Sequence, residues 1–266
     1  MGLRGAHSGN QERMPKKIAF LASDADVAQS ALTELVEQYG NVPPEDADII
    51  VSLGGDGFML RTLHITQDLP APVYGMNRGT IGFLMNEYSA TGLLQRLEEA
   101  EEAVINPLRM HAVDMAGRMH EALAINEVSL LRAGPQAARL KISVDGRVRM
   151  PELVCDGALV ATPAGSTAYN YSAHGPILPI EADVLALTAI AAFRPRRWRG
   201  ALLPKIARVR FDVIEPQKRP VVADSDSMQV ADIDWVEITS EPSVAHRLLF
   251  DPGHGLEERL ISEQFT

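Results

Sequence analysis

An alternation of strand-like and helical stretches over the first hundred residues constrains the fold more than any other feature. Three short apolar runs typical of buried strands lie at 17–22, 48–53 and 73–76. Apolar side chains at helical spacing predict helices at 28–39, 58–64 and 90–103. Gly40 suits the end of the first helix, and Asp24 or Asp26 is positioned to cap its start. Strands that alternate with helices predict a parallel sheet.

The pattern becomes β-rich after about Pro107. Apolar and polar residues alternate at 140–144 and at 148–150, and Asp145-Gly146 between them favours the positive φ angles of a hairpin turn. Further strand-like runs lie at 157–162, 207–213, 235–239 and 247–250. The sequence therefore predicts an α/β N-terminal domain with a parallel sheet and a β-rich, antiparallel, sandwich-like second domain. The tail, 255–265, is expected to be helical.

Charge and composition argue against several functions and locations. Acidic residues outnumber basic ones by 35 to 25, and the net charge of −10 argues against nucleic-acid and anionic-membrane partners, which need a basic face. The longest apolar stretch, 184–193, is about half of the ~20 residues that span a bilayer. The single cysteine, Cys155, fits a reducing compartment, so we expect a cytoplasmic protein. Residues 1–16 lack the apolar middle of a signal peptide and are expected to form a flexible extension.

A glycine-rich turn, Gly54-Gly55-Asp56-Gly57, follows the second predicted strand and begins a predicted helix. Backbone amides at glycines can approach a phosphate, and a helix N-terminus adds partial positive charge, so the three glycines are candidate phosphate-binding residues. The carboxylate of Asp56 would repel a phosphate, and it is better placed to accept a proton from an attacking hydroxyl or to hold a metal ion. A tight turn with a capping aspartate is the alternative interpretation, and the motif alone does not separate the two.

A second candidate site runs from Asp156 to Pro179, where an apolar strand enters a loop rich in Gly, Ser, Thr and Tyr. Small residues let a flat ligand approach the backbone, and hydroxyl groups can bond its polar edge. Tyr169 can stack on a nucleotide base. A long structural loop with β-turns is the alternative, which the density of small hydroxyl residues disfavours.

These motifs resemble those of the NAD kinase family, bacterial type. Four segments carry the resemblance, namely Gly54–Gly57, Asn126-Glu127, the run 156–179 and the glycine turn at 75–83. The first motif alone is shared with 6-phosphofructokinases and with diacylglycerol and sphingosine kinases. The stretch 165–169 together with Asn126-Glu127 is far more specific to NAD kinases.

The resemblance implies that an α/β domain, 17–105, is completed by the returning tail, 251–266, and that a β-rich NAD-binding domain occupies 106–250. The dinucleotide would lie between the domains, and the subunits would form a homodimer or homotetramer. The implied reaction transfers the γ-phosphoryl of ATP, or of polyphosphate in some members, to the 2′-hydroxyl of the adenosine ribose of NAD, giving NADP. No cluster of His, Cys, Asp and Glu has metal-site spacing, so Mg²⁺ or another divalent cation would be carried in with ATP.

The resemblance also implies roles for individual residues, with Asp56 as the catalytic proton acceptor. The residues that match NAD-binding positions are Asp56, Gly57, Arg61, Asn126, Glu127, Asp156, Ala164, Thr167, Ala168, Tyr169, Ser172 and Ala191. Asp156 matches a residue that often reaches the ligand of a neighbouring subunit. From spacing alone, Arg61 is equally a solvated helix arginine, Asn126-Glu127 a turn at a strand end, and Asp156 part of an Asp-Gly turn.

Some positions depart from the family pattern. His174 stands where many members have glycine or asparagine, and it receives no role. Residues 223–226 read Ala-Asp-Ser-Asp where many members have Asp-Gly-Gln, which leaves that contact in doubt. The basic run from Arg194 to Arg199 could hold ATP phosphates, although a solvated loop or subunit contact is favoured. Two other functions stay open, a kinase that acts on a sugar phosphate or lipid, and a silent NAD-binding sensor, against which the intact Asp56 argues.

Overall fold

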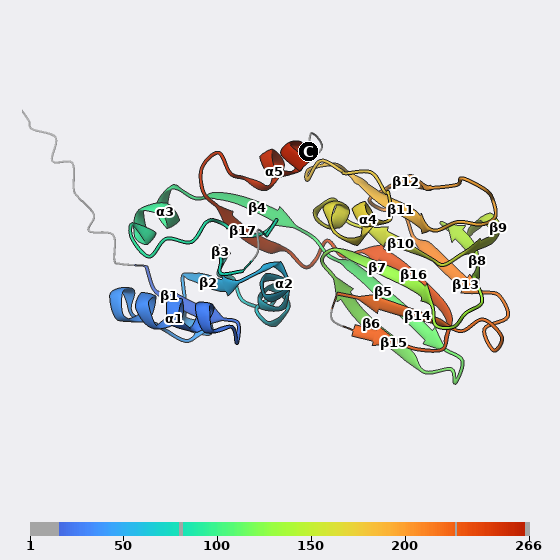
Figure 1. Ribbon diagram of the computed structural model, residues 1–266, viewed down its shortest axis with the longest axis horizontal. Helices are drawn as coiled ribbons and strands as arrows, with labels where there is room; N and C mark the ends of the chain where they lie inside the picture. Colours follow the sequence, from blue (N-terminus) through green and yellow to red (C-terminus); the bar gives the residue numbers. More distant parts are fainter. Residues whose placement is uncertain (1–15, 80–81, 227, 264–266) are drawn as a thin grey trace, which may run out of the picture.

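The computed structural model describes residues 16–79, 82–226 and 228–263. They form two domains side by side along the long axis of the molecule, and the chain passes from one to the other and back (Figure 1). No helix in these ranges is long and apolar enough to cross a membrane. The predicted flexible extension, 1–16, lies outside the described residues except for Lys16.

The first domain is built on a five-stranded sheet. Its strands, in spatial order, are β1 (Ile18–Ala22), β2 (Ile49–Gly54), β3 (Val73–Asn77), β17 (His246–Phe250) and β4 (Glu101–Ile105). The first three are parallel, as predicted, β17 adds a fourth parallel strand, and β4 pairs antiparallel with β17 at the edge. The helices of this domain are α1 (Asp26–Tyr39), the short 3₁₀ turn η1 (Pro44–Asp46), α2 (Asp56–Ile65), α3 (Leu93–Glu99) and α5 (Leu256–Glu263).

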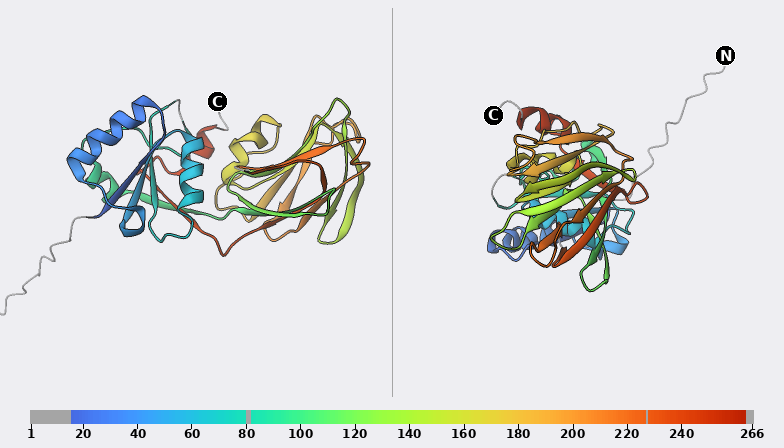
Figure 2. Two further views of the ribbon diagram at one scale, coloured as in Figure 1. Left: turned by 90° about the horizontal axis from the view of Figure 1, so that it is seen from below. Right: turned by 90° about the vertical axis from the view of Figure 1, so that its right-hand side faces the viewer.

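The helices α1 and α2 cover opposite faces of this sheet, because alternate strand side chains point to opposite sides. Leu35 of α1 belongs to a buried cluster with Phe20. Met59 of α2 belongs to a second cluster with Ile50. Figure 2 shows that α2 is the helix turned toward the second domain. The helix that starts at the glycine-rich turn therefore lies at the boundary between the domains.

Two local predictions in this domain are wrong. The helix expected at 90–103 is confined to α3, because Gly92 precedes it at φ 72° and residues 101–105 pair with β17 as strand β4. The start of α1 is not capped by Asp24 or Asp26, since its N-cap is Ala25 and no side chain bonds the free amides there. Tertiary pairing and backbone geometry outweigh the local sequence preferences at both places.

The return of the chain to the first domain begins earlier than the predicted boundary after residue 250. The run 247–250 was expected in the β-rich domain, but Leu248 and Leu249 of β17 pair with Val73 and Tyr74 of β3. An apolar run does not reveal which of two sheets it joins, so the sequence pattern could not place it. The predicted tail helix is confirmed as α5, over the part of it that is described.

The second domain consists of two six-stranded sheets of antiparallel pairs. One holds β5 (Leu108–Asp114), β6 (Met119–Ala124), β8 (Ala138–Val144), β9 (Arg147–Cys155), β13 (Val209–Val213) and β16 (Ile233–Ser240). The other holds β7 (Glu127–Arg132), β10 (Gly157–Ala161), β11 (Val184–Ile190), β12 (Gly200–Pro204), β14 (Val221–Ser225) and β15 (Met228–Val230). Both contribute to one apolar core, which includes Phe211 and Val160, so the sandwich-like prediction is confirmed.

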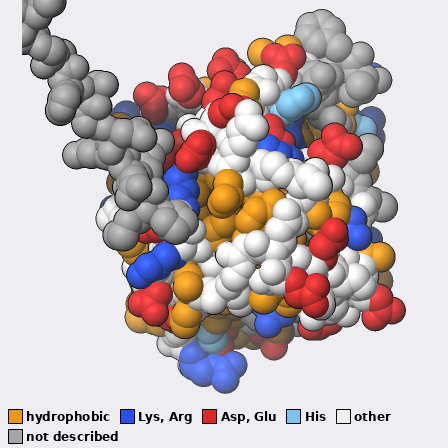
Figure 3. Space-filling view, turned by 90° about the vertical axis from the view of Figure 1, so that its left-hand side faces the viewer, with side chains coloured by type: hydrophobic (Ala, Val, Ile, Leu, Met, Phe, Trp, Pro, Cys, Tyr) orange, Lys and Arg blue, Asp and Glu red, His pale blue; other side chains and the backbone are white. Residues whose placement is uncertain are grey.

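The hairpin predicted at Asp145-Gly146 is confirmed, with φ angles of 52° and 74° at the two turn residues. Cys155 is buried at the end of β9, in the same core as Phe211. On the end of the molecule drawn in Figure 3, acidic and basic side chains are interspersed around a central group of hydrophobic ones. The negative net charge is thus not gathered into one block on this face.

Candidate functional site

The glycine-rich turn joins the end of β2 to the start of α2. Gly54 is the last residue of the strand, Gly55 is the N-cap, and Asp56 opens the helix. A Cβ atom added at Gly55 or at Gly57 would meet no atom within 4 Å. Packing against the described residues therefore does not require glycine at either position, and these residues leave the helix N-terminus open to a ligand from that side. Gly54 differs, because a Cβ there would lie 2.8 Å from Cβ of Phe58.

The side chain of Asp56 is held by the loop that follows β3, and it does not cap α2. Oδ2 accepts the amide of Phe83 at 2.6 Å, and Oδ1 accepts the amide of Leu84 at 2.9 Å. A Cβ atom at Gly82 would come within 2.5 Å of Oδ1, so only glycine allows this approach. Each carboxylate oxygen has a second lone pair, so Asp56 is fixed in orientation and still able to accept a hydrogen bond.

Hydrogen bonds join the segment 125–127, which holds the Asn126-Glu127 pair, to the segment 162–165 of the third motif. We call these two segments the contact unit. The carbonyl oxygen of Asn126 accepts the amide of Thr162 at 2.9 Å, and Thr162 Oγ1 donates to the carbonyl of Ile125 at 2.7 Å. The amide of Gly165 donates to Thr162 Oγ1 at 2.9 Å. A Cβ atom at Gly165 would lie 2.2 Å from the carbonyl oxygen of Asn126, so the two segments touch backbone to backbone.

Two buried polar side chains, Ser166 and Asn170, which the sequence did not single out, brace the loop of the third motif. Ser166 Oγ donates to the carbonyl of Pro163 at 2.7 Å and accepts the amide of Leu178 at 3.0 Å. Asn170 donates to the carbonyls of Ser166 at 3.0 Å and Pro176 at 2.9 Å, and its Oδ1 accepts Thr188 Oγ1 at 2.6 Å. The 3₁₀ turn η2 (Ala164–Thr167) and the short helix α4 (Tyr169–Ser172) are fixed in this way. Thr167, Ala168 and Tyr169 are half-buried and Ser172 is exposed, so this stretch keeps surface for a ligand.

The predicted motifs from both domains meet at one buried apolar cluster. It contains Met59 of α2, Ile125 next to the Asn-Glu pair, and Ala164 at the start of η2. Figure 2 shows α2 and α4 on the facing sides of the two domains. The first, second and third motifs, far apart in the sequence, are therefore neighbours in the fold.

Within the contact unit, one carboxylate oxygen of Glu127 is available to bond a ligand. Its Oε2 is buried and has no hydrogen-bond partner among the described residues. Burial raises the pKa of Glu127 to about 8, Asp226 and Asp224 add to the rise, and a backbone hydrogen bond from Tyr169 acts in the opposite direction. A buried acceptor without a partner is costly, so this carboxyl group is suited to bonding a ligand hydroxyl.

Replacing Glu127 by glutamine should remove a pH dependence of stability. The folded-state pKa of about 8 lies above the ordinary value of 4.5, so this group favours folding below about pH 4.5 and loses that contribution as the pH rises toward 8. Relative to wild type, Glu127→Gln should gain about 2–4 kcal/mol in unfolding free energy between pH 5 and pH 8. Urea unfolding across that range measures it, with Glu98→Gln on the exposed side of α3 as control. Parallel curves for Glu127→Gln and wild type would show that Glu127 is solvated and ordinary.

Asp226 is a site residue that the sequence motifs missed. Its side chain is only 3% exposed, and its carboxylate accepts the amides of Ile125 and Asn126, the latter at 3.3 Å. It also contacts Nε2 of His64, in the last turn of α2, at 3.1 Å. Asp226 thus joins the helix that begins at Asp56 to the backbone that positions Glu127. It lies in the segment that departs from the family pattern, which was the available signal.

Comparison with known proteins identifies the family of this arrangement. Residues 6–102 match the ATP-NAD kinase N-terminal domain, and residues 125–246 match the ATP-NAD kinase C-terminal domain. This chain belongs to the NAD kinase family. An NAD kinase of Cereibacter sphaeroides is 72% identical over 252 residues, which cover 95% of this chain and 99% of the relative. The chain is therefore an enzyme, a phosphotransferase of the NAD kinase type.

Solved structures of NAD kinases share the fold. The yeast NADH kinase complexed with NADH superposes with a TM-score of 0.81 at 20% identity, covering 96% of this chain and 88% of that one. The NAD kinase from Archaeoglobus fulgidus in complex with ATP gives a TM-score of 0.71 at 25% identity, covering 93% and 97%. Family membership disfavours both a sugar-phosphate or lipid kinase and a silent sensor.

Three residues predicted from NAD kinase motifs lie apart from the contact unit. Asp156 and Ala191 are at the opposite end of β10 and β11 from Glu127 and Thr162, about 15 Å along the strands. Asp156 is partly exposed and is paired with Nε of Arg132 at 2.6 Å. Ala191 is exposed and has φ 48°. Arg61 is exposed on α2 and makes no ion pair with any described residue.

Two further features of the sequence, His174 and the basic run from Arg194 to Arg199, lie on the surface. His174 is exposed and has φ 61° at the end of the α4 segment. The arginines at 194, 196, 197 and 199 are all exposed, and the guanidinium of Arg194 lies 5.4 Å from the ring centroid of Phe193. Their exposure agrees with the favoured interpretation of a solvated loop.

Proposed function

We propose that this enzyme transfers the γ-phosphoryl of ATP to the 2′-hydroxyl of the adenosine ribose of NAD and forms NADP. The convergence of the three motifs around Met59, Ile125 and Ala164 carries the proposal. It brings together the carboxylate of Asp56, a glycine-rich turn that can bind phosphate, and a loop that can accommodate a nucleotide base. Related proteins are described with NADH in one case and with ATP in the other. The cytoplasm is the proposed location, since the single cysteine, Cys155, is buried and unpaired.

Asp56 is the proposed catalytic base. Its carboxylate is oriented by the amides of Phe83 and Leu84, and a second lone pair on each oxygen can accept the proton of the attacking hydroxyl. The helix N-terminus beside it, with Gly55 and Gly57 open to solvent, is the proposed place for the phosphates. Phosphoryl transfer depends mainly on positioning and charge stabilisation, which a pre-oriented carboxylate and fixed backbone amides provide.

The second and third motifs are proposed to bind the dinucleotide. The unpartnered Glu127 Oε2 would bond a ribose hydroxyl, with Asn126 beside it. The half-buried residues Thr167, Ala168 and Tyr169, with the buried Ala164 and the exposed Ser172, would line the adenosine pocket. The buried braces Ser166 and Asn170 fix the backbone of this pocket before the ligand arrives.

A homo-oligomeric enzyme is proposed because Asp156 and Ala191 lie at the far end of β10 and β11. At about 15 Å from Glu127 they suit either the remote end of an extended dinucleotide or the ligand of a neighbouring subunit. A homodimer or homotetramer would allow the second arrangement.

Mg²⁺ or another divalent cation is proposed to arrive with ATP and to neutralise charge on the phosphates. No group of three His, Cys, Asp or Glu side chains in the described ranges could enclose a cation. The described residues thus offer few ligands of their own, which suits an ion bound mostly by phosphate oxygens and water. Asp56 is the carboxylate nearest the turn.

Incubation of the purified enzyme with NAD and Mg²⁺ plus either ATP or polyphosphate tests this function. NADP, read by an NADP-specific dehydrogenase, should form with ATP, and the polyphosphate arm shows whether that donor is also accepted. A folded protein that makes no NADP with either donor and phosphorylates a sugar or lipid would overturn the proposal.

Tyr169→Ala should weaken NAD binding by about 1–3 kcal/mol, taking base–aromatic stacking as the guide. Stacking is equal in the ground and transition states, so KM for NAD should rise while kcat changes little. Tyr171→Ala is the matched control, because this neighbour on α4 is 45% exposed. Steady-state kinetics decide it, and an unchanged KM with a lowered kcat would contradict the placement of adenine against Tyr169.

A further inference from the structure

We infer that Arg259 of α5 is a positioning residue for Asp56, acting through the loop at 82–86. The inference rests on the proposed catalytic role of Asp56. It concerns a residue from the other end of the chain, outside the motifs from which the function was predicted.

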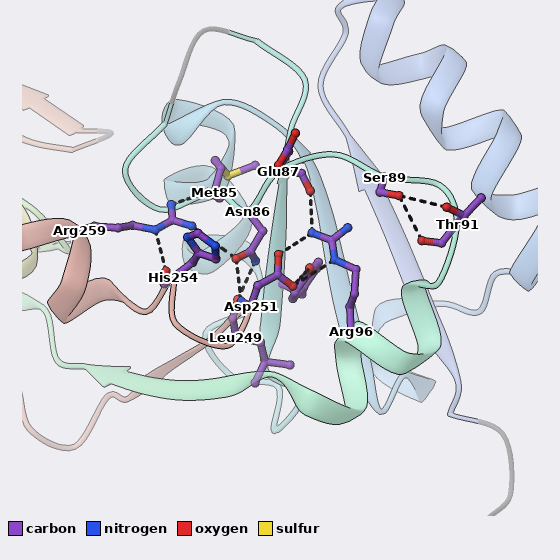
Figure 4. A network of polar contacts seen from close by, with 11 residues as sticks. Met85, Asn86, Glu87, Ser89, Thr91, Arg96, Leu249, Asp251, His254 and Arg259 are labelled. Carbon is purple, nitrogen blue, oxygen red and sulfur yellow. Dashed lines mark hydrogen bonds and ion pairs between the residues drawn. The ribbon is translucent and has the colours of Figure 1, made fainter. Parts of the chain in front are cut away.

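The guanidinium of Arg259 gathers the carbonyl groups of this loop. Its Nη1 donates to the carbonyl oxygens of Phe83 at 3.1 Å, Gly82 at 3.4 Å and Met85. Its Nε donates to the carbonyl of His254 at 2.8 Å, which fixes the arginine on its own segment. Figure 4 shows Arg259 reaching from the C-terminal segment toward Met85 and Asn86.

Two successive peptide units connect Arg259 to Asp56. In the first, the carbonyl of Gly82 faces Arg259 and the amide of Phe83 donates to Asp56. In the second, the carbonyl of Phe83 faces Arg259 and the amide of Leu84 donates to Asp56. Both peptide dipoles therefore have their negative ends at the cation and their positive ends at the carboxylate. Hydrogen bonds in such a chain polarise and strengthen one another.

Among the described residues, the loop packs against an apolar cluster on one side and borders a cavity on the other, where its hydrogen bonds fix its position. Leu84 and Met85 are buried in the apolar cluster beneath α2. On the other side, Gly82, Met85 and Arg259 border a cavity of about 950 Å³. A loop beside a hollow can shift by small amounts when its polar contacts are removed, and small shifts at a catalytic group are costly.

The far end of the loop has anchors of its own besides Arg259, whose Nη2 also lies 3.5 Å from Oδ1 of Asn86. Asn86, which is 1% exposed, donates to the carbonyl of Leu249 and accepts the amide of Asp251, both at 3.0 Å. Asp251 is bonded in turn by Arg96 at 2.6 Å (Figure 4) and by Tyr74 at 2.6 Å. Because the other bonds of this network still attach β17 to the loop when Arg259 is lost, that loss should loosen 82–85 and leave the domain folded.

Arg259→Gln should therefore lower kcat by about 10- to 100-fold with KM for NAD changed less than about twofold. Arg247→Gln is the matched control, because this arginine of β17 is paired with the exposed Glu102 and does not reach the loop. Arg259→Lys should also be slow, since lysine has no counterpart of the Nε–H that ties Arg259 to the carbonyl of His254 or of the Nη2 that approaches Asn86. A wild-type kcat for Arg259→Gln would overturn the inference.

A double-mutant cycle with Asp56→Asn separates positioning from a general structural role. If Arg259 acts through Asp56, Arg259→Gln should change the residual kcat of Asp56→Asn by less than about twofold. Equal effects in both backgrounds, with a matching loss of thermal stability, would show a structural role and overturn the inference. Near-normal kcat for Asp56→Asn alone would instead overturn the proposed function of Asp56, so the two failures are distinguishable.

Discussion

Asp56→Asn should lower kcat by about 10²–10⁴-fold, the usual contribution of a general base, while NAD binding stays measurable. The 2′-hydroxyl is a poor nucleophile at neutral pH, and asparagine cannot accept its proton. The substitution has a second consequence that the structure makes specific. The carboxylate accepts two amides, from Phe83 and Leu84, and an asparagine side chain has only one oxygen for them. One loop amide then loses its acceptor, at a cost of about 1–3 kcal/mol in stability.

Calorimetry with NAD and thermal melting must therefore accompany the kinetics of Asp56→Asn. Asp68→Asn is the control, since Asp68 is exposed beyond the end of α2. Retained NAD binding with little turnover supports the role in chemistry. A near-normal kcat would contradict it, and a variant that neither binds NAD nor melts as a folded protein would assign Asp56 to the fold.

The overall fold was largely predictable because its signals are periodic. Strand and helix alternation up to about residue 105 predicts the α/β class of the first domain, and two-residue alternation after about Pro107 predicts the β-rich class of the second. The errors occur where pairing partners decide. Residues 101–105 have helical spacing but complete a sheet edge as β4, and the apolar run of β17 joins β3 instead of the sandwich. No local pattern records which distant strand supplies the hydrogen bonds.

Residue type suggested part of the candidate site, because the turn at Gly55 and Asp56 pointed to phosphate chemistry, whereas Glu127 was predicted only from the resemblance to NAD kinases. Two classes of residue were missed by the sequence motifs. Asp226 and Arg259 act through backbone groups, so any segment that presents an amide or carbonyl at that point would suit them. Ser166 and Asn170 lie inside the third motif but support its backbone from within. A sequence motif indicates the side chains that contact the ligand, but it does not indicate the residues that hold those side chains in position.

Gly165→Ala should lower kcat/KM for NAD by about 10²-fold or more, through the packing of the second motif against the third. The added Cβ would lie 2.2 Å from the carbonyl oxygen of Asn126 and 2.4 Å from its Cα. Both obstacles are backbone atoms, and they are fixed by the bonds to Thr162 and Asp226. The clash must therefore push η2 away from Glu127, which separates the two halves of the proposed NAD pocket.

The same variant should lose about 1–3 kcal/mol of unfolding free energy, the usual cost of overpacking. Gly134→Ala is the matched control, because a Cβ there meets no atom within 4 Å and its φ angle is not positive. Kinetics and urea unfolding on both variants decide the matter. If Gly165→Ala were less stable but kept a normal kcat/KM, the contact between the motifs would serve the fold alone. If both quantities were unchanged, the close approach of Gly165 to Asn126 would itself be wrong. Glycine would then not be needed at this position to bring the adenosine pocket close to Glu127, the proposed ligand of the ribose.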